Sequence, residues 1–165
     1  SFDVKASYSQ ENDKLLYRSN KNLTDGTLLT VNNGYEAGNS FYTLYDDVST
    51  FGVFGEIKAN ISKNLETGAT VNINSYGMKN EALAWNLPPF MATIFGTYKY
   101  EKWSGKAELF AVGKRKDILV QQDNKEIPIF LGGYLDVNIT GNYEFSKKWS
   151  AFLELNNFFA GVSCR

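Results

Sequence analysis

Ten ionisable side chains stand at alternate positions of several short segments, and they are the residues best able to interact with a solute. On one face of a sheet inside a wide barrel, they would line a solute path or contact a plug. In a barrel of eight strands the interior is just wide enough for side chains, so a mutually neutralising network is favoured. These six acids and four lysines are expected to face a lumen: Asp3, Lys5, Glu56, Lys58, Glu66, Lys99, Lys106, Glu108, Asp136 and Glu144.

Catalytic and metal chemistry is not expected. The chain contains no His, which removes the commonest general base and the commonest metal ligand. Asp46, Asp47 and Glu36 lack the regular spacing of a calcium loop, so a solvated loop is the preferred interpretation. We therefore expect neither enzymatic activity nor a metal or cofactor. Trp85 and Phe90 could grip a sugar or peptide at a rim, but folded-over loop packing is the preferred explanation.

Composition excludes some partners. The net charge of -1 and the pI near 5.5 leave no basic surplus to neutralise phosphates, so nucleic acid is excluded as a partner. A length of 165 residues suits one domain. No apolar run approaches the roughly 20 residues that a spanning helix needs, and the lone Cys164 leaves the redox compartment open.

The elements that position these residues are strands, because apolar and polar residues alternate with a period of two. Residues 10–40 have a loop composition, with strand extensions at 13–18 and 27–32, and residues 41–47 carry the chain back. A polar loop is expected at 76–87 and a charged loop at 114–127. Short turns at 62–64, 101–102 and 146–148 alternate with these longer loops, and an even strand count would place both termini at the short-turn end. The eight predicted strands are 2–9, 51–62, 65–73, 90–100, 103–111, 131–145, 149–155 and 158–165.

Aromatic residues gather on the uncharged face of these strands, beside the short turns. Amphipathic rings settle at the headgroup level of a membrane, so an interface girdle is predicted. The predicted fold is all-β, a transmembrane antiparallel up-and-down β-barrel with eight visible strands, either complete or the C-terminal part of a larger barrel. A soluble lipocalin-like barrel would also alternate and is the third alternative. The girdle residues are Tyr98, Tyr100, Trp103, Tyr143, Phe145 and Trp149.

Four segments between Phe41 and Phe159 resemble the C-terminal barrel region of TonB-dependent-receptor-like outer-membrane proteins of Bacteroidota-type bacteria. The resemblance implies that residues 1–165 are an outer-membrane barrel domain or a C-terminal barrel fragment, without a plug domain. The implied partners are the lipid bilayer, the barrel-assembly machinery, and other outer-membrane proteins or surface lipoproteins. The segments are FYTLYDDVSTFGVFGEIKANISKNLETGATVNINSYGM, AWNLPPFMATIFGTYKY, KAELFAVGKRKD and YLDVNITGNYEFSKKWSAFLELNNFF.

The function implied by this resemblance is transport across the bacterial outer membrane. The chain would be the barrel portion of a TonB-dependent-receptor-like transporter or a porin. The alternative is a structural or docking barrel subunit of an outer-membrane protein assembly.

Overall fold

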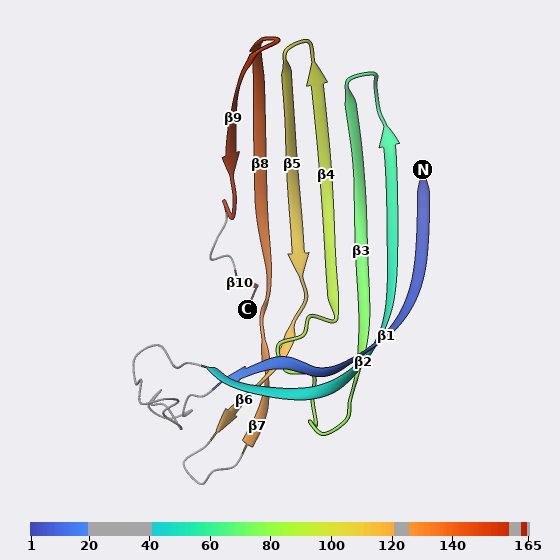
Figure 1. Cartoon of the computed structure of the whole chain (residues 1–165), viewed down its shortest axis with the longest axis vertical. Coiled ribbons are helices and arrows are strands. Elements are labelled where there is room, and N and C mark those ends of the chain that lie inside the picture. The colour runs from blue at the N-terminus through green and yellow to red at the C-terminus, as the bar shows by residue number, and fades with distance from the viewer. Residues whose placement is uncertain (20–40, 121–125, 159–162, 165) are drawn as a thin grey trace.

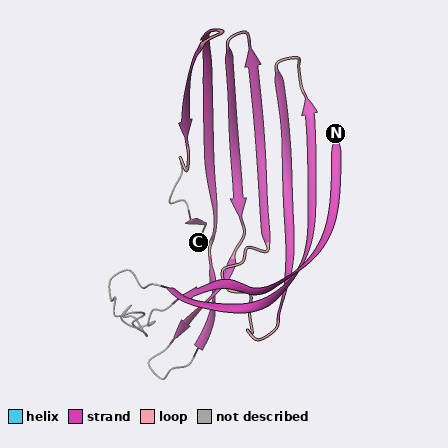
Figure 2. Cartoon of the chain, viewed as in Figure 1, coloured by secondary structure: helices cyan, strands magenta, loops and turns pink. Residues whose placement is uncertain are grey.

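The computed structural model describes residues 1–19, 41–120, 126–158 and 163–164, and these residues form strands without any helix. Figures 1 and 2 show the strands side by side in one curved sheet, with a small hairpin at one end. No helix in the described part of the chain could cross a membrane. The strands are β1 (Phe2–Ser19), β2 (Phe41–Asn60), β3 (Leu65–Met78), β4 (Phe90–Tyr100), β5 (Trp103–Val112), β6 (Arg115–Val120), β7 (Glu126–Leu131), β8 (Gly133–Ser146), β9 (Trp149–Leu155) and β10 (Ser163–Cys164).

The main sheet is antiparallel throughout, in the order β1-β2-β3-β4-β5-β8, with β9 and β10 both paired to β8. Tyr134 of β8 pairs with Val112 of β5 on one edge and with Ser163 of β10 on the other. Since β5 fills one edge of β8, β9 and β10 share the other edge. The predicted eighth strand is therefore not a separate position in the sheet.

The sheet is open, which corrects the predicted barrel. Among the described residues β1 pairs only with β2, and β9 only with β8, so no pairing joins the two edges. The all-β antiparallel architecture and the consecutive order of neighbouring strands agree with the prediction. Closure is a property of pairing between the first and last strands, which alternation within single strands does not report.

Short turns and long connections separate to opposite ends of the sheet, as expected. The β2–β3, β4–β5 and β8–β9 turns lie together at the top of Figure 1. The N-terminal amine donates a hydrogen bond to the carbonyl of Lys58 at 2.7 Å, close to this end. Cys164 instead pairs with Gly133, toward the other end, so the prediction that both termini lie at the short-turn end was wrong.

The β1–β2 hairpin is longer than predicted. Residues 10–19 continue β1 rather than entering a loop, which corrects the loop prediction and confirms the extension at 13–18; the extension predicted at 27–32 lies outside the described residues. One extra residue bulges from β1 between Glu11 and Lys14, where Asp13 has a φ of 52°. A bulge bends the strand that carries it, and the hairpin sweeps sideways in Figure 1.

A second hairpin corrects the predicted charged loop at 114–127. β6 and β7 pair with each other at the end of β5 and β8 opposite the short turns. Gly113 and Gly133 lie where the two long strands approach closely, and a Cβ on Gly133 would stand 2.6 Å from the carbonyl oxygen of Val112. A glycine therefore stands at each passage between the main sheet and the β6–β7 hairpin: Gly113 after β5 and Gly133 at the start of β8.

The buried apolar side chains of the described residues are Leu16, Val48, Trp85 and Ile118. They come from β1, β2, the β3–β4 connection and β6, and so lie at the end opposite the short turns. Over the rest of the sheet, large apolar side chains are exposed. Among the residues that the structure describes, the sheet thus has a small core at its long-connection end, and none of them forms an apolar layer over its main span.

Candidate functional site

The strand register places all ten predicted lumen residues on one face of the sheet, here called the polar face. Asp3 stands opposite Glu56, and Lys106 is opposite both Thr97 and Thr140. Residues two apart on a strand share a face, so the remaining members follow from the same register. Their facing a lumen remains a prediction, because the sheet is open.

Three ion pairs join six of the ten residues. Each links positions two apart on one strand: Lys5 to Asp3 at 2.7 Å, Lys58 to Glu56 at 2.9 Å, and Lys106 to Glu108 at 2.6 Å. Glu66, Lys99 and Glu144 have no ion pair with another described residue, whereas Asp136 is buried and accepts a hydrogen bond from the Val137 amide at 2.8 Å. The polar face is thus partly neutralised along its strands.

Aromatic rings also stand on the polar face, and the sequence prediction gave them no role. Lys5 lies 5.9 Å from the centre of the Phe54 ring, and Lys106 lies at the same distance from Phe95. Nearer the long connections, the Arg115 guanidinium lies 5.8 Å from the ring centre of Tyr134. Cations over rings are attracted by the quadrupole of the ring. The sequence indicates these rings, because Phe54 and Phe95 are apolar residues at positions where their strands otherwise carry polar residues.

The opposite face, here called the apolar face, carries no charged residue from the row of Phe51 to the short turns, whereas Asp47 stands on it farther along β2 toward the long connections. One row crosses the sheet as Ile57, Ala69, Ile94 and Leu109. Ile94 is 57% exposed, and Ile57 is 55% exposed. Single exposed apolar residues are ordinary, but a contiguous exposed apolar face marks a surface that something apolar covers.

Aromatic residues bound this face at the short turns. The register aligns Tyr100, Trp103 and Tyr143 in one row, and the Trp103 and Tyr143 rings are 4.4 Å apart. The rings of Tyr143 and Phe145 meet edge to face at 4.9 Å. Tyr98 and Trp149 are exposed at the same end. All six predicted girdle residues thus gather on the apolar face beside the short turns, and their contact with a membrane interface remains a prediction.

A second set of exposed aromatics lies at the other end of the apolar face. Tyr8 pairs with Phe51, and Phe90 pairs with Ile73 one row away. All three aromatic rings are exposed. Sequence reasoning had placed them within strands without noting their common level, because that level depends on the register between strands.

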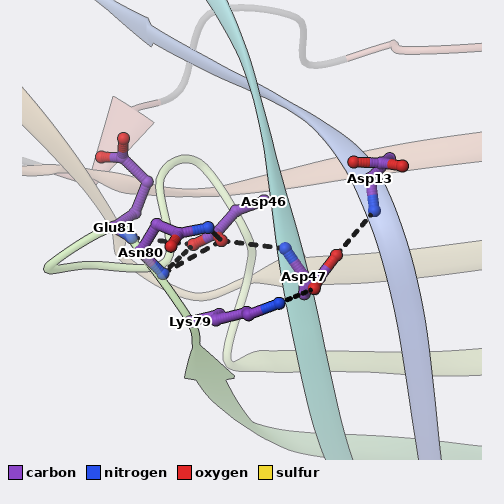
Figure 3. A network of polar contacts seen from close by, with 6 residues as sticks. All are labelled: Asp13, Asp46, Asp47, Lys79, Asn80 and Glu81. Carbon is purple, nitrogen blue, oxygen red and sulfur yellow. Dashed lines mark hydrogen bonds and ion pairs between the residues drawn. The ribbon is translucent and has the colours of Figure 1, made fainter.

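Asp46 is held by a network of hydrogen bonds at the long-connection end (Figure 3). It is 2% exposed and accepts hydrogen bonds from the amides of Asp47, Asn80 and Glu81 at 2.8 to 3.1 Å. The side-chain amide of Asn80 donates a further bond at 2.8 Å. Asp46 therefore anchors the start of the β3–β4 connection to β2. This corrects the prediction of a solvated loop, because Asp46 and Asp47 both lie in a strand.

Asp47, the next residue of β2, connects this strand to β1 and to the residue that follows β3. Its carboxylate accepts a hydrogen bond from Lys79 at 2.7 Å and one from the amide of Asp13 at 3.1 Å (Figure 3). The bond from Lys79 is the main reason that the pKa of Asp47 is lowered, and the same bond raises the pKa of Lys79. Burial alone would raise the pKa of Asp46, but the amides of Glu81 and Asn80 outweigh it and hold that pKa below its ordinary value.

Trp85 is packed inside this end of the molecule. It is buried, and its indole N–H donates to Glu81 at 2.6 Å. Loop packing, the preferred explanation, is what the structure shows for Trp85, whereas Phe90 is exposed on the apolar face. No cluster of His, Cys, Asp or Glu in the described part of the chain could hold a metal ion; Glu36 lies outside it.

The geometry resembles part of solved outer-membrane receptors. The pyoverdine receptor FpvA of Pseudomonas aeruginosa PAO1 bound to pyoverdine matches with a TM-score of 0.57 and 15% identity, over 96% of this chain and 23% of the receptor. The FpvAI–pyocin S2 complex matches with a TM-score of 0.57 and 15% identity, over 96% of this chain and 20% of that one. The ferripyoverdine receptor of P. aeruginosa bound to ferripyoverdine matches with a TM-score of 0.56 and 15% identity, over 96% and 21%.

No protein-family profile matches the chain, and no curated sequence is significantly similar. The chain spans about a fifth of the length of the receptors that it matches. At this identity the likeness shows the fold alone: the open sheet is similar in architecture to part of these outer-membrane receptors. The matches do not support the Bacteroidota-type origin in the predicted resemblance.

Proposed function

We propose that this chain forms part of the wall of a transmembrane β-barrel in a bacterial outer membrane. The barrel would be a TonB-dependent-receptor-like transporter or a porin that moves solutes. The observation that carries this proposal is the pairing of an exposed apolar face, uncharged from the row of Phe51 to the short turns, with a polar face on the same strands. Lipid would cover the first face, and an aqueous or plugged interior would border the second.

The length of the strands supports this proposal. β4 has 11 residues and ends in aromatic residues of the apolar face, Phe90 at one end and Tyr98 and Tyr100 at the other. At about 3.4 Å per residue it is roughly 37 Å long, and a tilt of about 45° reduces its height to about 26 Å. This height matches the apolar band of about 25 Å in outer-membrane barrels.

The charge distribution supports it as well. A Lys or Arg on the lipid face costs about 2 to 4 kcal/mol at the bilayer midplane, so this face should lack charge at mid-span, as it does from the row of Phe51 to the short turns. A soluble barrel also alternates, but it buries its apolar face. Here Leu135, Ile139 and Leu153 are all exposed.

Ion selectivity in planar bilayers tests the transport part of the proposal with the full-length protein. If the polar face borders an aqueous path, Lys106→Glu should shift the reversal potential toward cation preference. The matched control is Lys147→Glu in the β8–β9 turn, away from that face, which should leave selectivity unchanged. A folded, membrane-inserted protein that neither conducts nor takes up solute would favour the alternative, a structural or docking barrel subunit.

A further inference from the structure

A groove on the apolar face is lined by Lys114, which it shares with a second pocket that Lys116 also lines. It has a volume of about 260 Å³ and lies where the start of β4 meets the ends of β5 and β8. Phe90, Ala111 and Leu135 line it with apolar side chains, and Gly113 and Gly133 line it without any. A Cβ at Gly133 would collide with the backbone of Val112, so glycine is required at this lining position.

Of the described residues, Lys114 is the one charged residue that lines this groove. Lys114 also lines an adjoining pocket of about 370 Å³ together with Lys116 and the 69%-exposed Phe130. Both lysines are exposed, and no acid among the described residues forms an ion pair with either. The one acid that lines the adjoining pocket, Glu81, accepts the indole N–H of Trp85. The two cations are therefore free to meet an anion.

We infer that this groove and lysine pair bind a membrane lipid with a phosphate headgroup. One acyl chain would lie in the groove, and the phosphate would contact Lys114 and Lys116. This inference rests on the proposed membrane location of the apolar face. Phe90 marks the end of the apolar span, so the lysines just beyond it stand at headgroup level.

The chemistry of the site selects an amphipathic anion. A free phosphate would use the lysines but gain nothing from the apolar groove, whereas a zwitterionic lipid would fill the groove but meet the cations less favourably. Each lysine near a membrane surface favours an anionic lipid about fivefold, so the pair favours it about 30-fold.

Lipid retention measured by native mass spectrometry tests the inference with the full-length protein. The protein is released from micelles that contain equal amounts of phosphatidylglycerol and phosphatidylcholine. The wild type should retain phosphatidylglycerol preferentially, and Lys114→Gln with Lys116→Gln should reduce that preference by about 10- to 30-fold. The matched control is Lys147→Gln with Lys148→Gln, two adjacent exposed lysines at the opposite end, which should leave the preference unchanged.

A second pair of variants tests the groove without changing charge. Ala111→Phe should fill the groove and reduce retention of phosphatidylglycerol, whereas Ala107→Phe, on the same strand and face outside the groove, should not. Equal effects of the two lysine pairs, or no effect of Ala111→Phe, would overturn the site. Full displacement of the lipid by excess inorganic phosphate would do so too, because it would show binding without an acyl chain.

The outcomes separate this inference from the proposed function. If the chain is not in a membrane, neither lipid will be retained and both substitutions on β5 will be silent. If only the lipid site is wrong, the protein will retain both lipids equally.

Discussion

Replacing Asp46 should release the start of the β3–β4 connection while the main sheet stays paired. Asp46→Asn keeps the size of the side chain but removes the charge and turns one acceptor oxygen into a donor. The amides of Asn80 and Glu81 then compete for one remaining oxygen. We expect these amides to lose the protection that the carboxylate gives them.

The expected magnitude follows from the two amides of the connection. A hydrogen bond to a charged acceptor contributes about 1.5 to 3 kcal/mol, and a buried amide left without a partner costs about 1 to 3 kcal/mol. Taking about 1.5 kcal/mol for each amide gives about 3 kcal/mol of local opening free energy. At about 1.4 kcal/mol per tenfold, the opening equilibrium should rise on the order of 100-fold.

Hydrogen exchange followed by mass spectrometry measures this change in the peptide that contains Asn80 and Glu81. Asp47→Asn is the matched control, because it removes the charge and leaves Lys79 and the Asp13 amide one acceptor oxygen, but it touches no bond to Asn80 or Glu81. The anchoring argument fails if Asp46→Asn leaves exchange in this peptide unchanged, or if Asp47→Asn speeds it equally. Faster exchange across β4 and β5 would instead mean that the variant unfolds globally.

Three further predictions concern the two faces of the sheet, the packing at Gly68 and the effect of acid pH on Asp46. Ile94→Arg, on the apolar face, should lower the free energy of unfolding in lipid vesicles by about 2 to 4 kcal/mol. Thr93→Arg, on the polar face next to it, should lower it less. Urea titration in vesicles compares the two variants, and equal losses would contradict the assignment of faces. Gly68→Ala should lower the free energy of unfolding by about 1 to 3 kcal/mol in the same titration, because the new Cβ would lie 2.5 Å from the Phe95 ring and 2.6 Å from a backbone oxygen. A Cβ at Gly96 would meet nothing within 4 Å, so Gly96→Ala is the control and should be nearly neutral. A neutral Gly68→Ala would refute the packing argument. The folded-state pKa of Asp46 lies below its ordinary 3.8, so the stability that its carboxylate contributes is present above pH 3.8 and is lost as the pH falls through the lower folded-state pKa. Hydrogen exchange at Asn80 and Glu81, corrected for the intrinsic rate, should therefore rise only in that acid range. Asp46→Asn should abolish this rise.

Alternation along single strands was enough to predict the two faces of the sheet. β4 runs over the predicted residues 90–100, and β9 over 149–155. The girdle residues and the ten ionisable residues fall on opposite faces because a period of two in the sequence becomes a face in any extended strand. These predictions needed no knowledge of which strands pair.

Features that depend on distant contacts were missed. Asn12 and Asp13 have the composition of a loop, yet they form a bulge that the Asp47 carboxylate holds through the Asp13 amide. Ile118 lies in a charged segment, but it is buried in the core beside the long connections. The shared edge of β9 and β10 depends on pairing to β8, which the sequence of neither strand reports.

The most direct test of the central claim, that the apolar face of this sheet contacts lipid, is the accessibility of nitroxide labels along β8. Single cysteines at Val137, Asn138, Ile139 and Thr140, in a Cys164→Ser background of the full-length protein in vesicles, would report collisions with oxygen and with a water-soluble nickel chelate. Labels at 137 and 139 should collide with oxygen and avoid nickel, and labels at 138 and 140 should not share that preference. If labels at 137 and 139 avoid both reagents while those at 138 and 140 meet nickel freely, the apolar side chains form a sealed interior and the membrane account is wrong.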